Sequence, residues 1–133
     1  MIAKPSPHIG TCSWKYDSWR GLIYSDAKEI NYLREYSRRF STVEVDQWFW
    51  SLFAGDKAVL PNPIRLHGGD RKEIEDRTGN DWSRIVEPKD HDLQSLAGMI
   101  VDLRDRNVET FLYVNNHFEG SAPRTIARIQ SLL

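Results

Sequence analysis

The sequence predicts an α/β protein built on a parallel sheet, and three observations support this fold class. Segments with the alternating pattern of β-strands are separated by segments with the periodicity of amphipathic helices, an order typical of parallel strands joined by right-handed crossovers. Polar residues follow the hydrophobic runs at their carboxyl ends, the edge at which such proteins bind ligands. The 133 residues are enough for one domain with a hydrophobic core but too few for two domains of ordinary size.

Four expected strands span residues 8–14, 42–50, 64–68 and 109–114. In the first, Gly10 indicates a bend or a close approach by another part of the backbone. In the second, a period of two places Glu44 and Asp46 on one face of the strand. Because a buried carboxylate is costly unless it is paired, hydrated or bound to a metal, these two residues mark either a ligand site or a network of ion pairs.

Four expected helices span residues 26–40, 71–77, 90–106 and 121–133. Asp26 and Asp70 are each followed three residues later by a glutamate, which is the capping-box pattern at a helix start. Asp90 and Ser121 are expected to cap the other two helices. Asn107 suits the left-handed residue that ends the third helix.

The composition excludes several classes of protein. The net charge of −1 provides no overall basic field, which disfavours nucleic-acid binding through Arg65, Arg71, Lys72 and Arg77. No apolar run approaches the ~20 residues of a membrane span, and the amino-terminal residues before the first strand have no apolar signal core. A single cysteine, Cys12, excludes an intramolecular disulfide and a cysteine-built zinc site, and it favours the reducing cytoplasm.

The carboxyl ends of the expected strands carry the residues that point to function. They are Trp14, Asp46, Gln47, His67, Asn115, Asn116 and His117. Because the carboxyl ends of parallel strands meet at one edge of a sheet, these side chains are expected to line one mouth. Gly68 and Gly69 precede a helix start with Arg71 and Lys72 nearby, an arrangement compatible with an anion site.

Five blocks of sequence carry a resemblance to a known family. They are residues 9–16, residues 19–21 with Tyr24, residues 43–46 with Phe49, residues 65–68, and residues 114–117 with Gly120, Ala122 and Pro123. In their order and spacing these blocks resemble the DUF72 (YecE-like) family. The resemblance implies a TIM-barrel-like fold in proteins usually about twice this length, with no established biochemical activity.

Set against that family, residues 1–133 form a single domain that lacks the central strands. Residues 8–50 resemble the first two βα units, residues 64–133 resemble the last two, and residues 51–63 link them across the deletion. In a closed eight-stranded barrel the last two strands neighbour the first two. The resemblance therefore implies a parallel βα half-barrel of about four strands.

A half-barrel has two unpaired edges, and exposed edges invite pairing with another chain. Four strands from each of two copies would total eight and close a two-fold barrel, so we expect a homodimer. The alternative is a monomer in which the loops 15–24 and 78–89 cover the inner face.

The first functional reading is a site at the strand ends for a phosphorylated or sugar-like ligand. Glu44, Asp46, His67 and His117 are the candidate catalytic residues, with the carboxylates as bases and the imidazoles as acids or bases. The candidate ligand-binding residues are Trp14, Tyr16, Trp19, Arg65, Gly68, Gly69, Asn115 and Asn116. No spacing in the sequence is diagnostic of a metal, so we predict no metal ligands, and the sequence indicates no particular cofactor.

The second reading is a non-catalytic binding or structural module. In it, Glu44, Asp46, Arg65 and His67 pair with one another inside the barrel, and the adjacent asparagines 115–116 fix loops by hydrogen bonds. Removing Asp46 or Arg65 would then leave a buried charge unpaired, at a cost of ~3–5 kcal/mol. The aromatic residues after the first strand would simply cover that strand.

Overall fold

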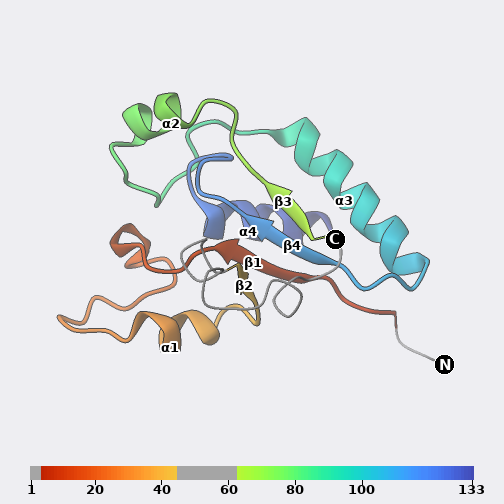
Figure 1. The fold of residues 1–133 in the computed structure, drawn as a ribbon, viewed down its shortest axis with the longest axis horizontal. Helices are drawn as coiled ribbons and strands as arrows, with labels where there is room; N and C mark the ends of the chain where they lie inside the picture. The colour runs from red at the N-terminus through yellow and green to blue at the C-terminus, as the bar shows by residue number, and fades with distance from the viewer. Residues whose placement is uncertain (1–3, 45–62) are drawn as a thin grey trace, which may run out of the picture.

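The computed structural model describes residues 4–44 and 63–133 and contains a four-stranded parallel sheet (Figure 1). The strands are β1 (His8–Cys12), β2 (Val43–Glu44), β3 (Ile64–Leu66) and β4 (Phe111–Val114). All three strand pairs are parallel, and the sheet is open within the described residues. The prediction of an α/β fold with a parallel half-barrel sheet is confirmed.

The strand order β2-β1-β4-β3 places the last strand beside the first. His8 pairs with Phe111 and Thr11 with Val114, so β1 and β4 form the centre of the sheet. This order is the one expected when the last two strands of a barrel lie next to the first two. The chain between the two sheet edges runs through residues 45–62; most of the expected linker and the end of the second expected strand lie outside the described residues.

Helices follow β1, β3 and β4. They are the 3₁₀ helix η1 (Asp17–Trp19), α1 (Tyr32–Ser37), α2 (Arg71–Thr78), α3 (Asp90–Asp105) and α4 (Ala122–Leu132). The last of these packs against β1 and β4 and contacts α3 (Figure 1). Helix α2 lies beyond the carboxyl ends of the strands, close to the expected mouth (Figure 1).

Two predicted helix starts are wrong. The first helix begins at Tyr32 rather than near Asp26, because the side chain of Asn31 accepts the N–H of Arg34 at 3.0 Å and caps it. The third helix has Lys89 as its N-cap residue, and Asp90 lies in the first helical turn. The second helix is capped as predicted, since Asp70 accepts the N–H of Glu73 at 3.1 Å.

The alternation of side chains gives the sheet two different faces. One face packs on α4, where Leu112 and Val114 of the sheet meet Ile126 and Ile129 of the helix in one buried cluster. We call the opposite side the inner face. It carries Cys12, Glu44, Arg65 and Tyr113, which the strand register places on neighbouring positions.

The hydroxyl group of Tyr36 ties α1 to the sheet. It accepts the buried N–H of Thr11 at 2.9 Å and donates to the carbonyl of Thr42, directly before β2, at 2.8 Å. Burial raises the pKa of the Tyr36 hydroxyl, so the group keeps the proton that it donates. The same backbone carbonyl of Thr42 lies against Gly10, where an added Cβ would stand 2.1 Å from it. The predicted close approach at Gly10 is therefore confirmed.

We expect Tyr36→Phe to lower the free energy of unfolding by about 1–3 kcal/mol, because the buried N–H of Thr11 loses its acceptor. Urea unfolding followed by circular dichroism measures the change. Tyr32→Phe is the matched control, since the Tyr32 hydroxyl donates to the exposed carboxylate of Asp17 at 3.0 Å. Equal losses in the two variants would contradict the role assigned to Tyr36.

Candidate functional site

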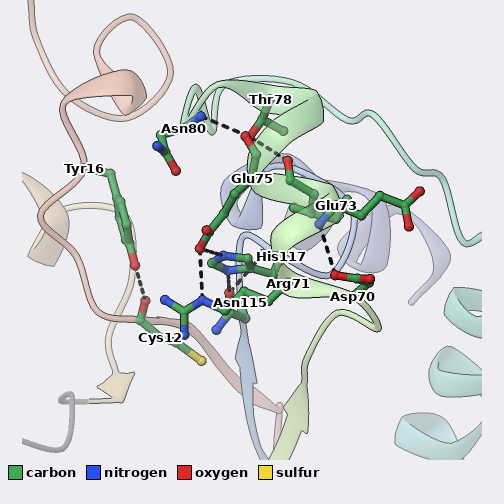
Figure 2. Close-up of polar contacts among 11 residues, drawn as sticks. Cys12, Tyr16, Asp70, Arg71, Glu73, Glu75, Thr78, Asn80, Asn115 and His117 are labelled. Atoms are coloured by element: carbon green, nitrogen blue, oxygen red, sulfur yellow. Dashed lines mark hydrogen bonds and ion pairs between the residues drawn. The ribbon is translucent and has the colours of Figure 1, made fainter.

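Four polar residues meet where β3 and β4 end, and we call them the mouth cluster: His117, Asn115, Glu75 and Arg71. The first two follow β4 directly, as predicted, and the other two lie on α2. Figure 2 shows the side chain of Glu75 reaching from the helix to the His117 ring, with Arg71 beside it. The parallel sheet thus brings a predicted imidazole together with a carboxylate that was not predicted.

The ring of His117 has an oxygen acceptor at each nitrogen. Nδ1 lies 2.6 Å from Oδ1 of Asn115, and Nε2 lies 3.0 Å from Oε1 of Glu75. The same Oδ1 accepts the backbone N–H of His117 at 2.9 Å, which identifies it as the oxygen end of the amide. The Nδ1 atom must therefore carry a proton, and the contact with Glu75 is a hydrogen bond when Nε2 carries one too.

The carboxylate of Glu75 contacts two partners, Arg71 and His117. Arg71 donates from Nε to Oε1 of Glu75 at 2.9 Å, one helical turn away. The hydrogen bond from Arg71, followed by that from His117, lowers the pKa of the Glu75 carboxyl. With the imidazole protonated, the cluster carries two positive charges and one negative charge. The Arg71 side chain is 80% exposed, which leaves its guanidinium accessible to a ligand.

One aromatic side chain contacts the mouth cluster, and two others lie on the β1 side of the sheet. The rings of Trp82 and His117 have centroids 4.7 Å apart. The backbone N–H of Trp82 donates to the hydroxyl of Ser18. Tyr16 is half-buried on the β1 side and donates to the carbonyl of Cys12 at 3.4 Å (Figure 2). Trp19 is fully buried against Tyr16, so it supports that wall from within the core.

The two glycines after β3 serve different purposes. A Cβ on Gly68 would lie 2.0 Å from the carbonyl oxygen of His117, so only glycine lets the two loops approach this closely. A Cβ on Gly69 would meet no atom within 4 Å. The amino terminus of α2 is already occupied by the carboxylate of Asp70. The predicted anion-binding role of the glycines stays a prediction.

The two asparagines both fix the loop after β4. Asn116 is buried, and its Oδ1 accepts the N–H of Ala122 at 2.8 Å, which caps α4. The predicted cap, Ser121, is the N-cap residue, but its side chain makes no capping hydrogen bond. The prediction is therefore wrong about the capping group, because an amide six residues before the helix start takes that place.

Glu44 and Arg65 form a second group, which we call the inner-face pair. Their side chains make an ion pair across the inner face, and the Cys12 thiol lies 3.5 Å from Oε1 of Glu44. The hydrogen bond that Arg65 donates to Glu44 raises the pKa of the Arg65 guanidinium. In the single chain the Arg65 side chain is 52% exposed, so the burial expected inside a closed barrel stays a prediction. A pair this exposed contributes about 0–1 kcal/mol.

The remaining predicted residues are dispersed. Asp46 lies outside the described residues, and His67 is exposed after β3. Trp14 lines an open surface groove of about 660 Å³ between the loop after β1 and the start of α1. Lys15 and Tyr32 also line it, and the Lys15 ammonium lies 5.9 Å from the centre of the Tyr32 ring.

Sequence reasoning missed Glu75 and Glu119. The first has a usable signal, because Arg71 and Glu75 are four residues apart on a predicted helix and share one face. The sequence around Glu119 has no such signal, and the structure shows this residue to be fully buried. Its Oε1 accepts the hydroxyl of Thr125 at 2.6 Å, its Oε2 accepts the N–H of Lys89 at 2.8 Å, and the same Oε2 lies 3.3 Å from Nη2 of Arg128.

Within residues 4–44 and 63–133, no group of three or more histidine, cysteine or acidic side chains is placed to hold a metal ion. No helix in that part of the chain is both long enough and apolar enough to cross a membrane.

The fold and the mouth cluster define a class of protein: an open parallel α/β sheet with polar residues gathered at the carboxyl ends of its strands. A family model described as a protein of unknown function, DUF72, matches residues 8–59 of the chain. The resemblance seen in the sequence is thereby confirmed. No curated protein and no solved structure matched the chain.

We expect Glu119→Ala to lower the free energy of unfolding by about 3–5 kcal/mol, because it leaves the buried partners of a carboxylate unpaired. Glu87→Ala is the control, since the Glu87 side chain is 43% exposed and its ion pair with Lys89 is 3.4 Å long. We expect a loss below about 1 kcal/mol there. Urea unfolding of both variants measures the two losses. Similar unfolding midpoints would contradict the stabilising role assigned to the buried Glu119 carboxylate.

Proposed function

We propose that the chain binds a small anionic ligand, phosphorylated or sugar-like, at the carboxyl ends of β3 and β4. The observation that carries this proposal is the His117 ring held between Asn115 and Glu75, with the exposed guanidinium of Arg71 next to it. The family description names no activity, so the proposal rests on the geometry of this chain.

The charge balance of the mouth cluster supports an anion. When His117 carries a proton on both ring nitrogens, it shares the single carboxylate of Glu75 with Arg71, which leaves one positive charge uncompensated. Hydrogen bonds in which one partner is charged are shorter and about twice as strong as neutral ones. An oxyanion could therefore replace Glu75 as the acceptor of the guanidinium without leaving any donor unpaired.

The aromatic residues support a ligand with a carbon ring or chain. Trp82 lies against the imidazole, and Tyr16 stands on the β1 side of the mouth. Aromatic rings present large, rigid apolar faces at low entropic cost, while their polar atoms hydrogen-bond at the edge. A phosphate or carboxylate on His117 and Arg71, with its carbon skeleton toward the aromatic rings, fits this arrangement.

Among the four predicted catalytic residues, His117 has the arrangement best suited to proton transfer. Its Nδ1 proton is fixed on Asn115, and its Nε2 faces the partly exposed Glu75, where a proton can leave or arrive. We assign no reaction to the chain. The single cysteine, Cys12, supports a reducing compartment such as the cytoplasm as its location.

Calorimetric titration with inorganic phosphate, glycerol 3-phosphate and glucose tests the ligand proposal. We expect the two phosphates to bind and glucose alone to bind more weakly. Arg71→Ala should weaken phosphate binding by about tenfold or more, because a charge-assisted hydrogen bond contributes about 1.5–3 kcal/mol.

Arg106→Ala is the matched control for this titration. Arg106 pairs with Asp102 four residues away on α3, as Arg71 pairs with Glu75 on α2, and it lies on an exposed helix end. Its removal should leave phosphate binding unchanged. Absence of phosphate binding by the unaltered protein, or an equal loss in the control, would overturn the proposal.

A second candidate function is assembly: two copies form a homodimeric eight-stranded barrel. Within the described residues, β2 and β3 each pair with one strand, so each has a free side. The loops 15–24 and 78–89 make their contacts at the strand ends, as in the hydrogen bond from Trp82 to Ser18. The inner face retains solvent contact, with side-chain exposures of 39% at His8 and 52% at Arg65.

Light scattering after size exclusion tests this assembly. At micromolar concentration we expect a mass near twice the 15.5 kDa of one chain. The expectation follows because edge pairing satisfies backbone groups that are otherwise hydrated, and because a closed barrel has no edges. A mass of one chain would rule out the dimer and leave the binding site to a monomer.

A further inference from the structure

The inner-face pair joins residues at opposite edges of the sheet. Glu44 lies on β2 and Arg65 on β3, and both β1 and β4 stand between them. Three strand spacings of ~4.8 Å therefore separate the two backbones. Side chains stand roughly perpendicular to a sheet, so in a flat sheet these two would rise side by side and not meet. Their contact means that the sheet curls around its inner face, as a barrel wall does.

The pair also gives the two sheet edges opposite charges. The β2 edge carries the carboxylate of Glu44, and the β3 edge carries the guanidinium of Arg65. If two copies close a barrel about a two-fold axis, β2 of each copy lies beside β3 of the other, and this junction occurs twice. Each junction then brings a negative edge against a positive edge.

The position of Arg65 lets its guanidinium reach such a junction. The side chain is 52% exposed and stands on an edge strand of three residues. The strand register places Arg65 next to Tyr113. The hydroxyl of Tyr113 makes its hydrogen bond with the side chain of Thr42 at 2.8 Å and not with Arg65. An exposed ion pair is weak, and exchanging one such pair for another costs little.

We propose that the partner of this chain is a second copy of itself, and that Glu44 of each copy pairs with Arg65 of the other across the two junctions. This inference rests on the proposed homodimer and adds the contact that sets its pairing. The two inner-face pairs, one within each chain, are replaced by two equivalent pairs between the chains. Eight strands leave an interior that side chains just fill, which suits the aromatic residues Phe111 and Tyr113 of the inner face.

Charge reversal separates pairing between chains from pairing within a chain. Glu44→Arg places two cations on the inner face of one chain, and Arg65→Glu places two anions there. Each variant alone has like charges at both junctions, so we expect it to be monomeric. In an equimolar mixture, both junctions of a mixed dimer become complementary, although each chain still has like charges within itself.

Light scattering on the two variants and their mixture is the measurement, with native mass spectrometry to identify the mixed dimer. We expect the apparent dissociation constant of the mixture to be at least tenfold lower than that of either variant alone. The double variant Glu44→Arg with Arg65→Glu should dimerise like the unaltered protein. Asp102→Arg and Arg106→Glu, which reverse charges in an exposed pair on α3, serve as controls and should leave dimers intact.

The outcomes distinguish this inference from the dimer proposal. If the unaltered protein is monomeric, the dimer itself fails. If the protein is dimeric and each single variant is dimeric as well, the dimer stands but Glu44 and Arg65 do not meet at its junctions. If the double variant dimerises while the mixture of single variants stays monomeric, the pair acts within each chain and the inference is overturned.

Discussion

The buried carboxylate of Glu119 is the interaction on which the mouth of the sheet depends. Its two oxygens bind the amino terminus of α3 through Lys89 and the body of α4 through Thr125. Its backbone carbonyl accepts the N–H groups of Val86 and Glu87, which anchors the loop that carries Trp82. One residue therefore positions two helices and a loop around His117, two residues away. The imidazole keeps its place because the backbone on both sides of it is fixed.

The fold was largely predictable because it follows from periodicity and connectivity. The period of two correctly placed Glu44 and Arg65 on the side of the sheet opposite the helix-packed core. The barrel resemblance correctly implied that the last strand lies beside the first. Gly10 also kept its predicted meaning, since the space for a side chain is taken by the Thr42 carbonyl. These features depend on short stretches of sequence or on the order of elements, and both are visible in one chain.

The site was less predictable because its contacts join distant parts of the chain. Glu75 is 42 residues from His117, and Lys89 is 30 residues from Glu119. A charged residue looks the same in sequence whether it is exposed or buried with partners. The predicted start of α1 was wrong for a local reason. Asp26 and Asn31 are both good N-cap residues, and it is Asn31 that caps the helix. Competition between two such signals is decided by packing, which periodicity does not report.

The pairing of β1 with β4 has a consequence for how the chain folds. The centre of the sheet joins residues from the two ends of the described chain, as in the pair of His8 with Phe111. The entropy lost in closing a loop grows with its length, and proteins dominated by such distant contacts fold slowly. During synthesis β1 cannot pair with β4 until β4 has been made, so the centre of the sheet forms late. Until then the aromatic segment around Trp14 and Trp19 has no completed sheet to pack on and stays exposed to water.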